Sequence, residues 1–183
     1  DGLTYVENNP DALVTFGIQP SFPSTQLGYI KLGKGSKCSD CDNKIFKVEA
    51  FKEKPDLATA KEYLSSGQYC WNAGLFVWKA KRILELLCEN IPQAKQPLQN
   101  IRSAWGGSGQ EDALAENFVK LPKISIDFAV MEKAPQVHAI KLNCQWFDMG
   151  SFSALADIIQ SDAGGNIIAA DQSERSEERR VGK

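Results

Sequence analysis

The chain has 183 residues, of which 43% are hydrophobic and 9% aromatic, enough for one globular domain with a real core. Its formal net charge is -2 with both signs mixed along the chain, so it offers no extended cationic surface to nucleic acid. Its longest apolar runs fall short of the roughly 20 residues that cross a bilayer, and five cysteines are an odd number, which argues against a disulfide scaffold. These features favour a cytoplasmic protein that binds neither nucleic acid nor membrane.

The first third of the chain predicts a buried strand followed by a hairpin. Residues 14–18 (VTFGI) form a nearly continuous apolar run that ends before Pro20, a pattern typical of a central parallel strand covered on both faces. Residues 28–30 (GYI) and 46–50 (FKVEA) then predict two antiparallel strands. The stretch between them is rich in Gly, Lys and Cys, so we expect a long hairpin tip.

A short helix and another buried strand are expected next. Leu57, Ala60 and Leu64 have helical spacing, and Gly67 is a suitable residue to end the helix. Residues 75–78 (LFVW) form a short apolar run that predicts a buried strand.

The following segments continue the alternation of helices and strands. Residues 83–121 predict mainly helical structure, interrupted by a flexible glycine-rich loop at 106–109. Ser125 is expected to cap a further helix, residues 137–142 alternate as a strand, and Ser151 is expected to cap a last helix. Strands interleaved with helices indicate an α/β sheet with crossover connections and an inserted hairpin.

Residues 171–183 (DQSERSEERRVGK) differ in character from the rest of the chain. Val181 is their single large apolar side chain, so they cannot bury enough surface to offset the entropy of ordering. We expect a disordered or non-native tail and leave it out of the functional argument.

Three short segments combine residues that could bind a phosphorylated sugar. Glu53 and Lys54 follow a predicted strand, where a carboxylate can accept from sugar hydroxyls and an ammonium can meet a phosphate. Asn72 can donate and accept hydrogen bonds, and Gly74 permits close approach of the backbone. Asp148 lies between a predicted strand and a helix start, where open α/β sheets hold ligands and metal ions. In isolation, each segment is explained as well or better by a surface ion pair or a turn.

The order of these segments is more specific than any one of them. Together they resemble mannose-1-phosphate guanylyltransferases (GDP-mannose pyrophosphorylases), a sugar-phosphate nucleotidyltransferase family, over about residues 13–159. The matching segments are VTFGIQP (14–20), GYI (28–30), FKEKP (51–55), WNAG (71–74), SIDFAVMEK (125–133) and WFDMG (146–150). The segment 125–133 is the most specific of them.

The resemblance implies an α/β fold with a Rossmann-like, glycosyltransferase-A-like mixed sheet and helices on both faces. Residues 1–170 would be the C-terminal, sugar-phosphate-binding part of a nucleotidyltransferase domain, incomplete at its N-terminus. The family's opening phosphate loop, G-G-x-G-T-R-L, does not occur in the sequence, and the loop at 106–109 lacks the strand and basic residue needed to replace it. We therefore expect this chain to be an inactive fragment of an enzyme.

The resemblance also assigns roles to individual residues. Lys54 and Asp148 would be catalytic, with Lys54 at the phosphate of the sugar 1-phosphate and Asp148 as a ligand of Mg²⁺. The residues that would bind the substrate, in addition to Lys54, are Gly28, Tyr29, Glu53, Asn72 and Asp127.

The implied reaction is transfer of a nucleotidyl group from GTP to mannose 1-phosphate, which gives GDP-mannose and pyrophosphate in the full-length protein. Two alternatives stay open: a nucleotidyltransferase for another hexose 1-phosphate, and a noncatalytic sugar-phosphate-binding or regulatory paralogue. The oligomeric state, a homo-oligomer included, also stays open, as does any further C-terminal domain.

Two other features have simpler explanations. Cys38 and Cys41 have the spacing of half a zinc site, but the remaining cysteines are scattered and supply no second pair. His138 shares a predicted strand face with Ile140 and Leu142, which favours a structural histidine.

Overall fold

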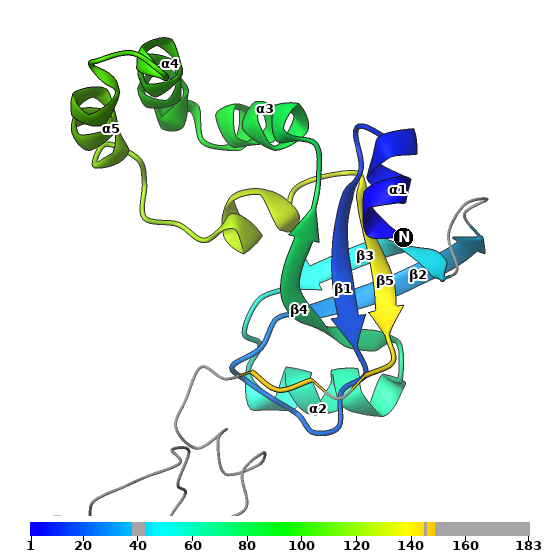
Figure 1. The fold of residues 1–183 in the computed structure, drawn as a ribbon. Coiled ribbons are helices and arrows are strands. Elements are labelled where there is room, and N and C mark those ends of the chain that lie inside the picture. The colour runs from blue at the N-terminus through cyan, green and yellow to red at the C-terminus, as the bar shows by residue number, and fades with distance from the viewer. Residues whose placement is uncertain (38–42, 145, 149–183) are drawn as a thin grey trace, which may run out of the picture. The chain divides into compact units, whose positions relative to one another are not determined.

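The computed structural model describes residues 1–37, 43–144 and 146–148 (Figure 1). The chain divides into two compact units, Asp1–Cys144 and Gln145–Lys183, and each is described by itself. The first unit contains all helices and strands given below. Cys38, Cys41, the helix expected after Ser151 and the tail 171–183 lie outside the described residues.

Five strands of the first unit pair into a closed sheet in the order β1-β4-β2-β3-β5. Their bounds are β1 (Leu13–Ile18), β2 (Tyr29–Lys37), β3 (Lys44–Lys52), β4 (Tyr69–Val77) and β5 (Val137–Leu142). The hairpin predicted from the sequence is confirmed as the antiparallel pair β2 and β3. The sheet closes because β3 also pairs antiparallel with β5.

Strand β1 has two neighbours in the closed sheet, and only one of them is parallel. It runs parallel to β5 and antiparallel to β4. The expected mixed sheet is confirmed, and the strand predicted to be parallel has one parallel and one antiparallel neighbour. The reversal lies in the β2–β3 hairpin: β3 and β4 both run antiparallel to β2, and α2 connects these two strands of equal direction, so that β4 is antiparallel to β1.

In the part of the chain that the structure describes, seven helical segments accompany these strands, and several of them cover the sheet. They are α1 (Gly2–Asn8), α2 (Leu57–Ser66), α3 (Ala80–Asn90), η1 (Pro92–Ala94), α4 (Lys95–Ala104), α5 (Gln110–Phe118) and the π-helix η2 (Asp127–Met131). Among the described residues, no helix is long and apolar enough to cross a membrane.

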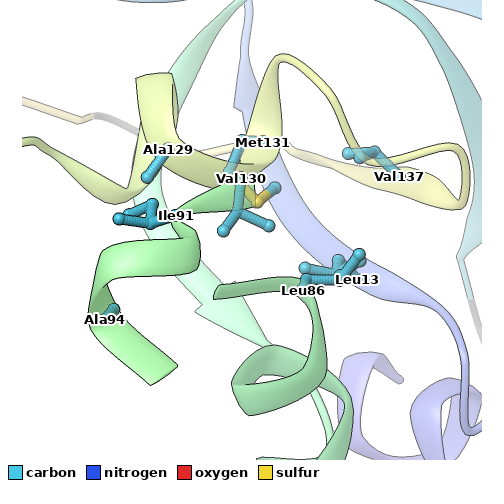
Figure 2. Packing of buried hydrophobic residues seen from close by; sticks show 8 residues of the cluster. All are labelled: Leu13, Leu86, Ile91, Ala94, Ala129, Val130, Met131 and Val137. Atoms are coloured by element: carbon cyan, nitrogen blue, oxygen red, sulfur yellow. The ribbon is translucent and has the colours of Figure 1, made fainter. Parts of the chain in front are cut away.

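The residues of β1 alternate between two apolar clusters. Val14 packs with Val6 of α1 and Ile140 of β5 on one face. Leu13 packs on the other face with Leu86 of α3, and Figure 2 shows this second cluster gathered between β1, α3 and η2. Helices therefore cover both faces of the sheet, as expected from the sequence. The eight buried members of the second cluster are Leu13, Leu86, Ile91, Ala94, Ala129, Val130, Met131 and Val137.

Local sequence signals determine the ends of α2. The Asp56 side chain caps its N-terminus by accepting from the Thr59 amide at 2.8 Å. Gly67 ends it with φ 65°, in the left-handed region that glycine adopts without strain. Both ends agree with the helix predicted from residues 57–67.

Two elements differ from the sequence-based expectations. Strand β4 begins at Tyr69 instead of residue 75, and it pairs with both β1 and β2. Its first half was not predicted because Asn72 and Gly74 interrupt the apolar pattern typical of a buried strand. Ser125 does not cap a helix through its side chain; Ile126 is the N-cap of η2, and Ser125 contributes its carbonyl to the Ala129 amide.

The surroundings of His138 are those of a histidine that contributes to packing. Its ring centroid lies 5.2 Å from that of Tyr5 on α1, and burial lowers the pKa of its imidazole. Among the described cysteines, Cys70, Cys88 and Cys144 are free thiols.

Candidate functional site

Three strand segments bring Gly28, Glu53 and Asn72 together. Gly28 directly precedes β2, Glu53 directly follows β3, and Asn72 lies within β4. The Asn72 backbone amide donates to the Gly28 carbonyl at 2.7 Å. A Cβ atom added to Gly28 would overlap the Glu53 carboxylate and would lie 3.5 Å from the Asn72 Cβ. Glycine is therefore required at this position for the Glu53 carboxylate to fold over the backbone.

The side chain of Asn72 connects this group to Asp127. Asn72 is 7% exposed, and its Nδ2 donates to the Asp127 Oδ1 at 3.3 Å. On its other side, the Thr15 hydroxyl donates to the Asn72 Oδ1 at 2.7 Å. A buried amide with both ends engaged has a defined orientation.

An irregularity in β4 aims Asn72 at the site. The register between β1 and β4 shifts from Thr15 opposite Phe76 to Gly17 opposite Asn72, so β4 carries extra residues at this point. Gly74 lies within the bulge with φ 69°. Bulges of this kind redirect side chains, which is consistent with an Asn72 that faces Asp127.

The Glu53 carboxylate is held in a partly desolvated, acidic environment. Its side chain is 13% exposed. Burial raises the pKa of Glu53, the negative charge of Asp127 raises it further, and the positive charge of Lys54 partly opposes both effects. The Glu53 backbone amide donates to the Glu132 Oε1 at 3.3 Å. A carboxylate in this environment is prepared to accept hydrogen bonds from hydroxyl groups that replace water.

Lys54 places a mobile cation at the edge of the group. Its Nζ is 3.7 Å from the Glu53 Oε1, and its side chain is 59% exposed. Its φ is 47°, an uncommon value for a residue other than glycine, and the following Pro55 restricts it further. Strained backbone of this kind concentrates at ligand-binding sites. The ammonium can leave Glu53 for a bound phosphate with little loss, since an exposed ion pair is weak.

Asp127 is positioned by the π-helix η2. Its carbonyl accepts from the Glu132 amide at 3.0 Å, the i to i+5 bond that defines the wider turn. Ala129, Val130 and Met131 anchor η2 in the core. Because short π-helical turns occur frequently at functional sites, this geometry supports a ligand-binding part for Asp127.

Tyr29 differs from the other candidates. Its side chain is fully buried, its hydroxyl donates to the Ser24 carbonyl at 3.0 Å, and its ring centroid is 5.4 Å from that of Tyr63. The structure thus places the backbone of Tyr29, next to Gly28, at the site and its side chain below it.

Asp148 belongs to the second unit, Gln145–Lys183, and is described by itself. Its side chain is exposed. The described residues contain no group of three or more His, Cys, Asp or Glu side chains that could hold a metal ion.

Two residues of the site had no assigned part in the sequence analysis. Thr15 contacts Asn72, and Glu132 contacts the Glu53 amide. Thr15 is a polar residue within an otherwise apolar strand, which was a usable signal. Glu132 lies inside the segment 125–133, but no sequence pattern connects it with a residue so distant along the chain.

The combined arrangement suits a sugar phosphate. Carboxylates at Glu53 and Asp127 accept hydrogen bonds, the amide of Asn72 donates, and the ammonium of Lys54 lies within reach of a phosphate. This set contains no nucleophile with an adjacent base, so it favours binding and orientation over covalent catalysis.

Comparisons with known proteins agree with this chemistry. Residues 4–164 match the family model described as nucleotidyl transferase. The xanthan biosynthesis protein XanB of Xanthomonas campestris pv. campestris is 43% identical over 164 residues, which are 87% of this chain and 33% of that protein. A mannose-1-phosphate guanylyltransferase of Escherichia coli is 38% identical over 174 residues, 93% of this chain and 36% of that protein. The chain thus spans about a third of the length of these curated relatives.

Solved structures show the same likeness. The crystal structure of a mannose-1-phosphate geranyltransferase from Thermus thermophilus has a TM-score of 0.69 at 34% identity and covers 88% of this chain and 43% of that one. The structure of a mannose-6-phosphate isomerase from Helicobacter pylori has a TM-score of 0.60 at 25% identity and covers 80% of this chain and 56% of that one.

Proposed function

This chain belongs to the nucleotidyl transferase family, and from that premise we propose that it forms the sugar-phosphate subsite of a mannose-1-phosphate guanylyltransferase. The proposed enzyme uses GTP and mannose 1-phosphate and contributes to GDP-mannose biosynthesis. Because the chain spans about a third of its curated relatives, the activity is proposed for the product of the whole reading frame. Composition supports a cytoplasmic location.

The observation that carries this proposal is the convergence of Gly28, Glu53, Asn72 and Asp127 around one point. These residues come from four different segments of the chain, yet the contacts of Asn72 and Glu53 join them. Several relatives at 36–40% identity are named mannose-1-phosphate guanylyltransferase or its putative form, which favours mannose 1-phosphate over another hexose 1-phosphate.

In the proposed reaction, a phosphate oxygen of mannose 1-phosphate attacks the α-phosphorus of GTP. A new P–O bond forms, the bond from the α-phosphorus to the bridging oxygen breaks, and pyrophosphate leaves. Glu53 and Asp127 accept from sugar hydroxyls, Asn72 donates to one, and Lys54 pairs with the sugar phosphate. These contacts hold the attacking oxygen in place, so that catalysis results from positioning and charge neutralisation.

The donor chemistry of Asp148 fits Mg²⁺. Magnesium is commonly held by one or two carboxylates together with substrate phosphates and water, and an exposed carboxylate such as that of Asp148 is a suitable ligand. When bound, the ion would neutralise charge that develops on the phosphate oxygens. We therefore propose that Asp148 contributes to catalysis as a metal ligand.

The proposal is tested by pyrophosphate release from the product of the whole reading frame. We expect release from GTP with mannose 1-phosphate and Mg²⁺, and a strong loss in Asp148→Asn. Release with glucose 1-phosphate but not mannose 1-phosphate would assign a different hexose. A folded protein that binds mannose 1-phosphate without release from any nucleoside triphosphate would be a noncatalytic sugar-phosphate-binding paralogue.

A further inference from the structure

The hydroxyl of Thr15 lies directly beneath the candidate site. Thr15 is fully buried in β1, and its Oγ1 is 2.7 Å from the Asn72 Oδ1 and 3.1 Å from the Leu75 carbonyl oxygen. A threonine hydroxyl has one proton, and both of these neighbours are acceptors. The shorter distance indicates that the proton is donated to Asn72.

The Asn72 amide could in principle occupy two orientations that exchange its nitrogen and oxygen. In the observed orientation, Nδ2 donates to the Asp127 Oδ1 at 3.3 Å. The exchanged orientation would place the Asn72 Oδ1 against a carboxylate oxygen, and two acceptors repel each other. It would also turn the Thr15 proton toward Leu75, so the hydroxyl and the amide must change together.

We propose that Thr15 is a positioning residue that fixes the Asn72 amide with its N–H groups directed toward Asp127 and the sugar. One Nδ2 proton is used by Asp127, and the second is left for a sugar hydroxyl. The site then presents a donor from Asn72 beside acceptors from Glu53 and Asp127. This inference rests on the proposed function because it assigns the ligand of Asn72 as a sugar.

This arrangement makes the subsite selective for a ligand with a hydroxyl group next to Asn72. A hydroxyl group can accept from Asn72 and donate to a carboxylate at the same time, whereas a deoxy or fluoro analogue cannot do both. Sites built to hydrogen-bond a hydroxyl discriminate against analogues that lack it, since the buried polar groups are then left unpaired.

The first test compares Thr15→Val with Thr15→Ser in the product of the whole reading frame. Valine keeps the branched shape and removes the donor, so we expect the KM for mannose 1-phosphate to rise about 10-fold, as for the loss of one net hydrogen bond. We expect the KM for GTP to stay within about twofold, and serine to restore the KM for mannose 1-phosphate. The matched control is Val14→Ala, because Val14 is buried in the same strand but faces α1.

The second test does not depend on activity. The side-chain amide signals of Asn72 are assigned in ¹⁵N spectra by their loss in Asn72→Asp. In the wild type we expect slow hydrogen exchange of the Nδ2 proton that is donated to Asp127, and in Thr15→Val we expect faster exchange of this proton and a changed chemical shift. Should Thr15→Val fail to fold, Thr15→Cys takes its place, since a thiol is only a weak donor.

The two tests separate the inference from the proposed function. Absence of pyrophosphate release in the wild type would count against the proposed function, while protection of this Asn72 proton that is lost in Thr15→Val would still support the positioning part of Thr15. Unchanged amide signals in a folded Thr15→Val would overturn the inference, as would KM values for both substrates that rise equally and are not restored by serine.

Discussion

Replacing Gly28 by alanine should damage ligand binding far more than stability. The added Cβ overlaps the Glu53 carboxylate, which must move by roughly 1 Å to regain an ordinary contact. The atom in the way is the end of a flexible side chain, so the fold can accommodate the change with a loss of less than about 1 kcal/mol. Misplacement of a substrate-positioning group by about 1 Å can cost up to about 100-fold in rate.

The assay measures the Kd for mannose 1-phosphate and the Tm of Gly28→Ala together. We expect affinity to fall by about 10- to 100-fold with a Tm close to that of the wild type. Gly67→Ala is the matched control, because Gly67 has φ 65° at the end of α2 and a Cβ there meets open space. It should cost about 1 kcal/mol of stability and leave affinity unchanged. Wild-type affinity in Gly28→Ala would refute the reasoning.

Three further predictions concern the core, the buried carboxylate and a helix cap. Met131→Ala should destabilise the protein by about 2–5 kcal/mol in denaturant titrations, because Met131 is buried. Phe128 lies in the same π-helix but is 43% exposed, so Phe128→Ala should cost less than about 1 kcal/mol. Equal losses of stability in the two variants would contradict the packing described. Burial and the charge of Asp127 raise the pKa of Glu53, so ionisation of this carboxyl group opposes folding. Glu53→Gln should therefore have a higher Tm than the wild type at pH values above the raised pKa, and the same Tm at pH values below the ordinary pKa of a glutamate. Binding of mannose 1-phosphate should be weakened in this variant. The hydrogen bonds from Thr59 hold the pKa of Asp56 low, so Asp56→Ala should lower the Tm at neutral pH, and the difference should vanish as the pH falls through the lowered pKa.

Elements with strong local signals could be predicted from the sequence. The helix α2 was predicted from the spacing of Leu57, Ala60 and Leu64 and from its terminator at Gly67, which are read from a few adjacent residues, and the structure adds the cap at Asp56. The strand β5 and the middle of β3 were predicted because their apolar residues alternate, whereas residues 31–37 of β2 were expected in the tip of the hairpin.

Features that depend on distant contacts could not be predicted in this way. The antiparallel pairing of β1 with β4 and the closure of the sheet through β3 and β5 join segments far apart along the chain. The early start of β4 was missed because Asn72 and Gly74 break its apolar pattern, and the same bulge aims Asn72 at Asp127. Local rules therefore failed where the site is built, which is expected when function competes with regular structure.

In the candidate site, too, some residues could be identified from the sequence and others only from the structure. The family resemblance supplied Gly28, Glu53, Asn72 and Asp127, and the structure gathers these four residues. The supporting hydrogen bond from Thr15 could not be inferred, because it depends on the side-chain geometry of two strands. Buried polar contacts of this type become visible only when the register of the sheet is known.

The central claim is that the cluster around Asn72 binds the sugar phosphate, and one calorimetric titration tests it most directly. Mannose 1-phosphate is titrated into the product of the whole reading frame as wild type, as Asp127→Ala and as the control Asp112→Ala, whose exposed carboxylate lies on α5. The account predicts binding to the wild type and the control, and a loss of at least about 10-fold in Asp127→Ala. Equal affinity in all three proteins would contradict the assignment of this cluster as the sugar-phosphate subsite.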